Sequence, residues 1–281
     1  FAKDSLFCAP RDANLVDYRV WRRELRSGRI APDADKGTHY QDATSHWYRS
    51  YGEGIVRFTA TERLSYKPEG PLGNIPYRIT AKHGKVWVVP GGRWSSQNSY
   101  PGHVMRYDGT HWKTITADTT YAKTHSAVLD FMNVAVDPTN LEHYYVTSYG
   151  TGLYEFDHDT LVRHDLAGGD NTLVSAAATA PDRYTRLDFA SYDSLGNLWF
   201  LNAGRTSQRQ CVRASGEWSA QDLVIDGVNF QVETPGGLII DQQRSSHKWI
   251  STARYNTMLC LIDENGTPWD DSDDRIKSRS Q

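Results

Sequence analysis

The stretch SYGTGLYEFD, residues 148–157, decides how this chain folds. The residues before it, 144–147, favour a β-strand, the Gly-Thr-Gly segment indicates a tight turn, and residues 153–156 favour the next strand. The stretch SYGEGIVRF, residues 50–58, has the same strand–turn–strand order without a gap. Two matching segments so far apart in one chain indicate an internal repeat.

The repeat extends over most of the chain as units of four short strands. One unit has strands at 77–80 and 85–89 joined by His83-Gly84, then strands at 103–107 and 111–115 joined by Asp108-Gly109. An aromatic residue anchors the second strand of each unit, at Trp47, Trp87, Tyr145, Trp199 and Trp249. Four strands per unit, repeated about every 50 residues, predict the blades of a β-propeller.

We therefore expect an all-β chain with almost no helix, built as a β-propeller of four-stranded antiparallel blades. About five full blades and a half blade in residues 1–18 are visible, so residues 1–281 form one propeller domain or a fragment of one. A lone meander cannot cover both of its faces, so blades must pack face to face, with Trp87, Trp199 and Trp249 in the core.

Residues 17–27 leave two alternatives open. They predict either a short helix with Tyr18, Trp21 and Leu25 on one face or a strand that ends at Gly28.

Composition excludes several classes of protein. The 281 residues are 38% hydrophobic and carry a net charge of −3, so the chain has no general attraction for nucleic acid or anionic membranes. No apolar run is long enough to insert into a membrane, and the first residues lack the features of a signal peptide. Cys8, Cys211 and Cys260 are expected as small buried side chains rather than a disulfide framework or a zinc site.

Three segments resemble known propeller repeats. Residues 189–200, FASYDSLGNLWF, resemble one half of the two-component-regulator propeller repeat, and residues 152–157, GLYEFD, resemble the other half. Residues 261–268 with the acidic run 270–275 are similar to a strand and turn of PorZ-like propellers of the type IX secretion system. Lys82-His83-Gly84 departs from the longer Asp-containing turn of the repeat, and Tyr145 replaces its Trp.

The resemblance implies a seven-bladed propeller within a larger chain. It also implies an extracytoplasmic location, in the periplasm or on the cell surface of a Gram-negative bacterium.

No motif for catalysis, a cofactor or a metal is present. The sequence lacks His-Glu-x-x-His, Gly-x-Ser-x-Gly and the phosphate-binding Gly-x-x-x-x-Gly-Lys, and His143, His158 and His164 have no metal-ligand spacing. We therefore predict no catalytic residue, no metal and no cofactor. The acidic residues between 263 and 274 form either a solvated turn or a calcium site, but they lack the order of an EF-hand loop.

The loops that join the second and third strands of each blade suggest a binding rim. In a propeller these loops open on the face where the innermost strands begin. The residues of interest in them are Arg93, Trp94, Tyr149, Arg205, Arg254 and Tyr255. Arginine beside aromatic rings suits a carboxylate, phosphate or sugar, although ordinary polar loops would have the same composition. An acidic glycan is the expected ligand.

Two classes of function follow. The first is a non-enzymatic extracytoplasmic module that binds a glycan or protein partner, as a PorZ-like secretion or surface-attachment component or as the periplasmic sensor of a hybrid two-component regulator. The second is a propeller lyase or glycoside hydrolase. Because propellers host both classes, the missing catalytic motifs are what favours binding.

Overall fold

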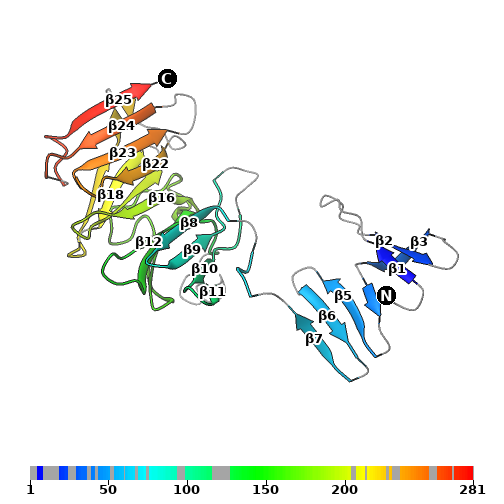
Figure 1. The fold of residues 1–281 in the computed structure, drawn as a ribbon. Coiled ribbons are helices and arrows are strands. Elements are labelled where there is room, and N and C mark those ends of the chain that lie inside the picture. Colours follow the sequence, from blue (N-terminus) through cyan, green and yellow to red (C-terminus); the bar gives the residue numbers. More distant parts are fainter. Residues whose placement is uncertain are drawn as a thin grey trace. The chain divides into compact units, whose positions relative to one another are not determined.

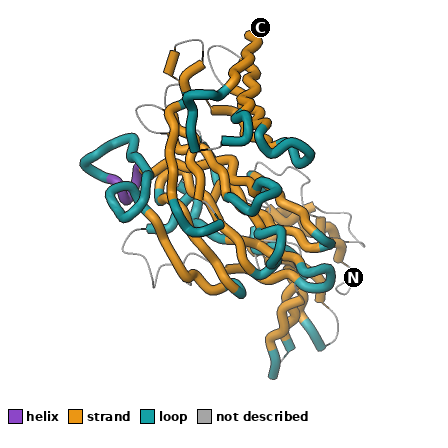
Figure 2. Tube along the Cα trace, turned by 90° about the vertical axis from the view of Figure 1, so that its left-hand side faces the viewer, coloured by secondary structure: helices purple, strands orange, loops and turns teal. Residues whose placement is uncertain are grey.

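The structure is a computed structural model. It describes residues 5–8, 19–24, 30–36, 39–41, 44–50, 54–59, 61–66, 69–73, 76–93, 99–115, 127–203, 207–212, 214–225, 228–229, 235–252, 258–267 and 269–280. The chain forms two compact units, Phe1–Gly70 and Pro71–Gln281. Figure 2 shows strands throughout the described residues, with one short helix. The predicted all-β class, with four-stranded antiparallel sheets, is confirmed.

The first unit contains two sheets. The first pairs β1 (Ser5–Cys8), β2 (Arg19–Glu24) and β3 (Ile30–Lys36); the second pairs β4 (His39–Gln41), β5 (His46–Ser50), β6 (Gly54–Phe58) and β7 (Arg63–Tyr66). The strand alternative for residues 17–27 is therefore correct where they are described, and the helix is wrong. Residues 19–24 form a strand because they pair with β1 on one edge and with β3 on the other, and this tertiary pairing overrides the helical pattern of the sequence. Residues 9–18, most of the expected half blade, lie outside the described residues.

The second unit contains four blades, each named here by its innermost strand (Figure 1). The β8 blade has β8 (Arg78–Lys82), β9 (Lys85–Val89), β10 (Val104–Tyr107) and β11 (Trp112–Ile115). The β12 blade has β12 (Phe131–Val136), β13 (His143–Gly150), β14 (Gly152–Asp157) and β15 (Thr160–Asp165). The β16 blade has β16 (Thr185–Tyr192), β17 (Leu198–Ala203), β18 (Ser207–Val212) and β19 (Trp218–Asp222). The β22 blade has β22 (Pro235–Ile240), β23 (His247–Thr252), β24 (Met258–Asp263) and β25 (Arg275–Ser280). The other elements among the described residues are the pair β20 (Val224–Ile225) and β21 (Val228–Asn229), and α2 (Pro181–Tyr184).

Three hydrophobic clusters fill the spaces between successive blades. The aromatic anchor of each second strand faces the next blade along the chain: Trp87 packs with Tyr144 of the β12 blade, and Trp199 packs with Ile250 of the β22 blade. Both tryptophans are fully buried, as predicted. The prediction is wrong for Trp249, which lies on the face of the β22 blade that points away from the β16 blade and is 37% exposed.

Aspartates hold the turns that follow three of the innermost strands. Asp193 accepts four hydrogen bonds of 2.9 Å, from the backbone N–H groups of Leu195 and Asn197, the Asn197 amide and the Trp199 indole. Asp137 and Asp241 accept backbone N–H groups in the equivalent turns. This explains the Asp and Trp of the segment 189–200, since the carboxylate ties the turn to the blade core.

The segment 148–157 forms a turn that glycine alone fits well. Gly152 has φ +84°, and a Cβ built on it would lie 2.1 Å from the carbonyl oxygen of Asp165. The Ser148 hydroxyl accepts the Thr151 N–H (3.0 Å) and donates to the Leu129 carbonyl (2.6 Å).

A backbone pairing joins two neighbouring blades at this turn. Tyr149 and Gly150, at the end of β13, pair with Arg186 and Thr185 at the start of β16. The β12 and β16 blades therefore share hydrogen-bonded strands as well as a hydrophobic cluster, which the repeat pattern does not predict.

Cys260 is fully buried, as expected, whereas the side chains of Cys8 and Cys211 are outside the described residues. No helix among the described residues is long and apolar enough to cross a membrane.

Candidate functional site

Two of the predicted rim residues lie within the described part of the chain and line one pocket. Arg93 and Tyr149 border a cavity of about 420 Å³ together with Asp130, Arg183, Tyr184 and Arg186. This cavity, called the rim pocket here, is formed where β13 ends and β16 begins. Trp94, Arg205, Arg254 and Tyr255 lie outside the described residues.

Arg93 is a buried, paired arginine. Its side chain is 5% exposed, and its Nη2 donates to Asp188 Oδ2 at 2.8 Å. The guanidinium carbon also lies 5.1 Å from the Tyr149 ring centre and 5.2 Å from that of Phe189. Because a carboxylate already balances its charge, Arg93 fixes Tyr149 and the pocket wall more than it attracts a ligand.

Arg186 supplies the cation that the rim pocket offers. Its guanidinium lies 5.3 Å from the Tyr149 ring centre and 5.4 Å from that of Tyr184. Neither Arg186 nor the exposed Arg183 forms an ion pair with a carboxylate among the described residues. Guanidinium groups that stack on tyrosine rings keep N–H edges for a carboxylate or phosphate.

Asp130 is the acidic residue in the rim pocket, and its oxygens are engaged. They accept the backbone N–H groups of Ser99 and Tyr100, both at 2.9 Å. Burial raises the pKa of Asp130, while these two hydrogen bonds oppose that rise. With Arg183 and Arg186 unpaired, the rim pocket carries an excess of positive charge.

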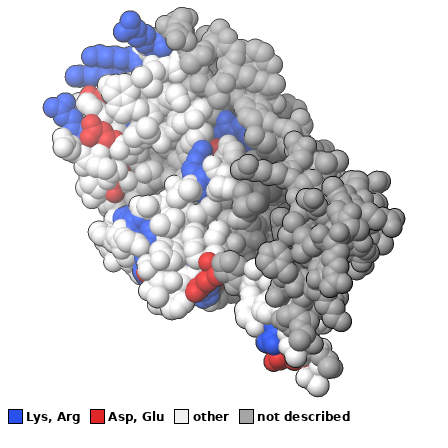
Figure 3. Space-filling model, turned by 45° about the vertical axis from the view of Figure 1, so that its right-hand side comes forward, with Lys and Arg blue, Asp and Glu red and all other residues white. Residues whose placement is uncertain are grey.

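That local excess contrasts with the net charge of the chain as a whole. The chain has a net charge of −3, and on the face shown in Figure 3 several described basic side chains gather at the upper left, whereas the other described charged side chains are scattered among neutral ones.

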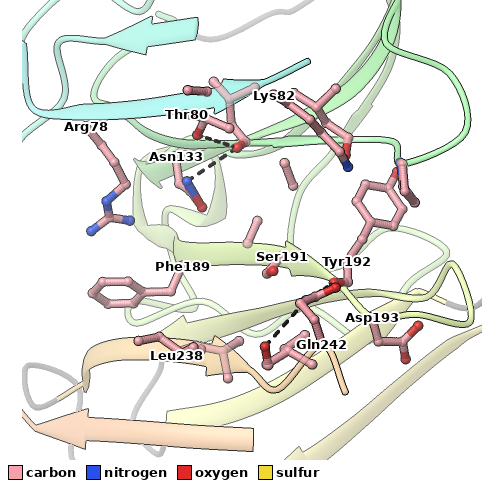
Figure 4. A pocket seen from close by; sticks show the side chains of 18 of the residues that line it. Arg78, Thr80, Lys82, Asn133, Phe189, Ser191, Tyr192, Asp193, Leu238 and Gln242 are labelled. Carbon is pink, nitrogen blue, oxygen red and sulfur yellow. Dashed lines mark hydrogen bonds between the residues drawn. The ribbon is translucent and has the colours of Figure 1, made fainter. Parts of the chain in front are cut away.

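A second cavity follows the innermost strands of the four blades. It has a volume of about 730 Å³, and β8, β12, β16 and β22 all contribute to its walls (Figure 4). We call it the channel pocket. Arg78 and Phe189 lie at one end of it, and Lys82 and Tyr192 lie at the other.

Asp188 connects the two cavities. Its Oδ1 accepts Arg78 at 2.6 Å from the channel side, and its Oδ2 accepts Arg93 from the rim side. Phe189, the next residue, has φ +58° within a β-bulge of β16, and its ring lies 4.4 Å from the Arg78 guanidinium. A bulky side chain in the left-handed region is strained, and such strain is concentrated at functional sites.

A third hollow, of about 590 Å³, lies between the β12 and β16 blades and contains His143. The His143 ring lies between two carboxylates, with Nε2 2.9 Å from Glu155 Oε1 and Nδ1 3.2 Å from Asp137 Oδ2. These contacts, with Glu155 first, raise the pKa of His143 against the opposing effect of burial.

His143→Gln is expected to change how stability depends on pH. A histidine whose folded-state pKa is raised stabilises the fold fully below its unfolded pKa of about 6.5, and this contribution is lost as pH rises through the folded value. The variant should therefore lose stability mainly at low pH. Urea unfolding between about pH 5 and 9 measures this, across the range where histidine titrates.

His164→Gln is the matched control. Burial lowers the pKa of His164, so the wild-type residue contributes the opposite pH slope. If His143→Gln unfolds with the wild-type pH dependence, the two carboxylates do not hold a charged imidazole.

The acidic residues near the C-terminal end are engaged in closing a turn. Asp273 accepts hydrogen bonds from the Thr267 hydroxyl (2.7 Å) and the Asn265 amide (3.2 Å), and Asp270 accepts the Ser272 N–H. Among the residues that the structure describes, no group of three or more acidic, histidine or cysteine side chains could hold a metal ion.

The sequence pattern missed the residues that complete both cavities. Arg183 and Tyr184 come directly before the innermost strand β16 and Arg186 lies at its start, so none of the three is in a loop that joins second and third strands. The run Arg-Tyr-Thr-Arg at 183–186, basic and aromatic beside a strand start, is the signal that could have identified them. Asp188 carries no comparable signal, because its partners come from another blade.

Comparison with known proteins supports the fold. No protein-family model matches the sequence, and no curated protein matches it. Among solved structures, PorZ of Porphyromonas gingivalis, a surface component of the type IX secretion system, matches with a TM-score of 0.67 and 18% identity over 99% of this chain and 42% of PorZ. The chain thus spans less than half the length of PorZ, and it has a PorZ-like propeller fold.

Two further structures are more distant. YCF48 bound to a D1 peptide matches at TM-score 0.36 and 13% identity, over 89% of this chain and 74% of that one. A protein of unknown function from Bacteroides thetaiotaomicron matches with a TM-score of 0.41 and 13% identity, over 91% of this chain and 69% of that one. Neither is similar enough to carry an argument about function.

Proposed function

We propose that this chain is the binding propeller of a PorZ-like, extracytoplasmic, non-enzymatic protein and that its rim pocket recognises an acidic glycan. The similarity of the fold to PorZ, a bacterial surface component, supports the proposed extracytoplasmic location. No family model matches the sequence, so the two-component-regulator repeat gives no support to the alternative of a periplasmic sensor.

The observation that carries the proposal is the arrangement around Arg186. Two tyrosine rings flank its guanidinium, the Tyr149 side is fixed by backbone pairing, and no described carboxylate neutralises it. A uronate or similar acid could accept both N–H groups of the guanidinium edge while its ring stacks on tyrosine. The cavity of about 420 Å³ is within the usual range for small-ligand sites.

Arg186→Ala is expected to weaken binding to an acidic polysaccharide. The lost charge-assisted hydrogen bonds are worth about 1.5–3 kcal/mol, so the dissociation constant for polygalacturonate should rise roughly tenfold or more. Calorimetric titration measures this, with a neutral glucan of similar length as the ligand that should not bind.

Arg244→Ala is the matched control, because Arg244 is an exposed arginine in the turn after β22, outside the rim pocket. It should leave the dissociation constant unchanged. If the Arg186 and Arg244 variants bind the polysaccharide equally well, the rim residues are ordinary polar loop residues and not a binding site.

A further inference from the structure

The β8 blade differs from the other three blades at the end of its innermost strand. Lys82 stands where those blades have Asp137, Asp193 and Asp241. The turn after Lys82 is the two-residue His83-Gly84, with φ +47° and +77°, so it needs no aspartate to hold it. A lysine at this position is therefore not required by the turn.

Lys82 points along the channel pocket with unused hydrogen-bonding capacity. Its ammonium donates to the Val136 carbonyl at 3.2 Å, and its other N–H groups have no acceptor among the described residues. Burial lowers the pKa of Lys82, and the nearby Asp137 only partly offsets this. The Asp137 carboxylate is itself occupied by Thr139, Asn140 and His143.

The other end of the channel pocket is also cationic. Arg78 and Arg93 both pair with the carboxylate of Asp188, Arg78 with Oδ1 and Arg93 with Oδ2. Of the two arginines, Arg78 is the more accessible, with its side chain 26% exposed, and it lines the channel pocket. Arg78 and Lys82 are four residues apart on β8, so their backbones are separated by about 13 Å.

Besides these two cations the pocket offers an apolar wall and a few unused polar groups. Phe189 and Leu238 line the pocket at the Arg78 end (Figure 4). Asn133 is 7% exposed; its amide N–H donates to Val134, but its carbonyl oxygen has no partner among the described residues. The Ser191 and Tyr192 hydroxyls likewise have no partner in the described part of the chain.

We propose that the channel pocket is a second binding site, distinct from the rim pocket, for an elongated organic dianion. One carboxylate pairs with Lys82, the other pairs with Arg78, and the part of the ligand next to Arg78 lies along Phe189 and Leu238. The pocket volume of about 730 Å³ accommodates such a molecule.

A series of α,ω-dicarboxylates tests the proposed length and charge. Calorimetric titration of residues 1–281 with acids from succinate to sebacate should show affinity that rises with chain length, because only the longer acids reach both cations. Decanoate, with one carboxylate, should bind more weakly than sebacate. Lys82→Met should weaken sebacate binding about tenfold, since it removes one charged contact, while Lys82→Arg retains most of the affinity.

Lys277→Met, on β25 and outside the pocket, is the control and should bind sebacate as the wild type does. Arg186→Ala should also leave sebacate binding unchanged, which separates this site from the rim pocket. The proposal is overturned if no dicarboxylate binds, if the Lys82 and Lys277 variants bind equally, or if decanoate or inorganic phosphate binds as tightly as sebacate.

Discussion

Lys248→Met is expected to destabilise the fold by about 3–5 kcal/mol, because it leaves the carboxylate of Glu264 buried without its cation. Both side chains are 1% exposed and form an ion pair. The ammonium also donates to the Ser245 carbonyl at 2.9 Å and lies 3.9 Å from the Trp199 ring centre. Urea unfolding at neutral pH measures the loss.

The double variant Lys248→Met, Glu264→Leu separates charge from packing. With both charges removed and their volume kept, most of the lost stability should return, since a buried ion pair contributes little against apolar residues of similar size. A double variant that remains as unstable as the single one would show that packing of the lysine stem on Trp199, rather than the unpaired charge, is the cause.

Gly152→Ala is the second large expected effect, with a loss of about 3 kcal/mol or more. The new Cβ would meet the Asp165 carbonyl oxygen at 2.1 Å, a backbone atom that cannot move without opening the pairing of β14 with β15. Overpacking of this kind costs roughly 1–3 kcal/mol, and the left-handed backbone adds about 1–2 kcal/mol for a residue other than glycine. Unfolding in urea provides the measurement.

Gly168→Ala isolates the steric part of that effect. Gly168 has φ +89°, close to that of Gly152, but a Cβ there would meet nothing within 4 Å. It should cost about 1 kcal/mol, the backbone contribution alone. If the two glycine variants lose the same stability, the clash with Asp165 is relieved by movement and does not decide the turn.

The fold class could be predicted because each blade encodes its own turns and anchors locally. His83-Gly84 and Asn265-Gly266 take positive φ at both positions, as their sequences indicate. Burial of the anchors depends on more than the blade itself. Trp87 and Trp199 each have a following blade to pack against, whereas Trp249 lies on a face that no later described strand covers. Its sequence position is the same, so local pattern could not distinguish it.

The candidate site was only partly predictable for the same reason. The strand–turn pattern directs attention to Arg93 and Tyr149, and these two lie in contact at one pocket. The state of Arg93 could not be foreseen, because Asp188 reaches it from two blades further along the chain and does so through an irregularity in β16. Likewise, the position of Arg186 opposite Tyr149 depends on strand pairing between blades.

The pairing of β13 with β16 also bears on the entropy cost of the binding proposed for the rim pocket. The main chains of Tyr149 and Arg186 are paired and their side chains stack on each other, so the proposed ligand would meet a floor of the rim pocket that is already ordered. Immobilising a side chain on binding costs about 0.5–1.5 kcal/mol, and a preorganised floor avoids part of that cost. If the rim pocket binds the acidic glycan proposed above, a modest set of contacts is enough for a useful affinity.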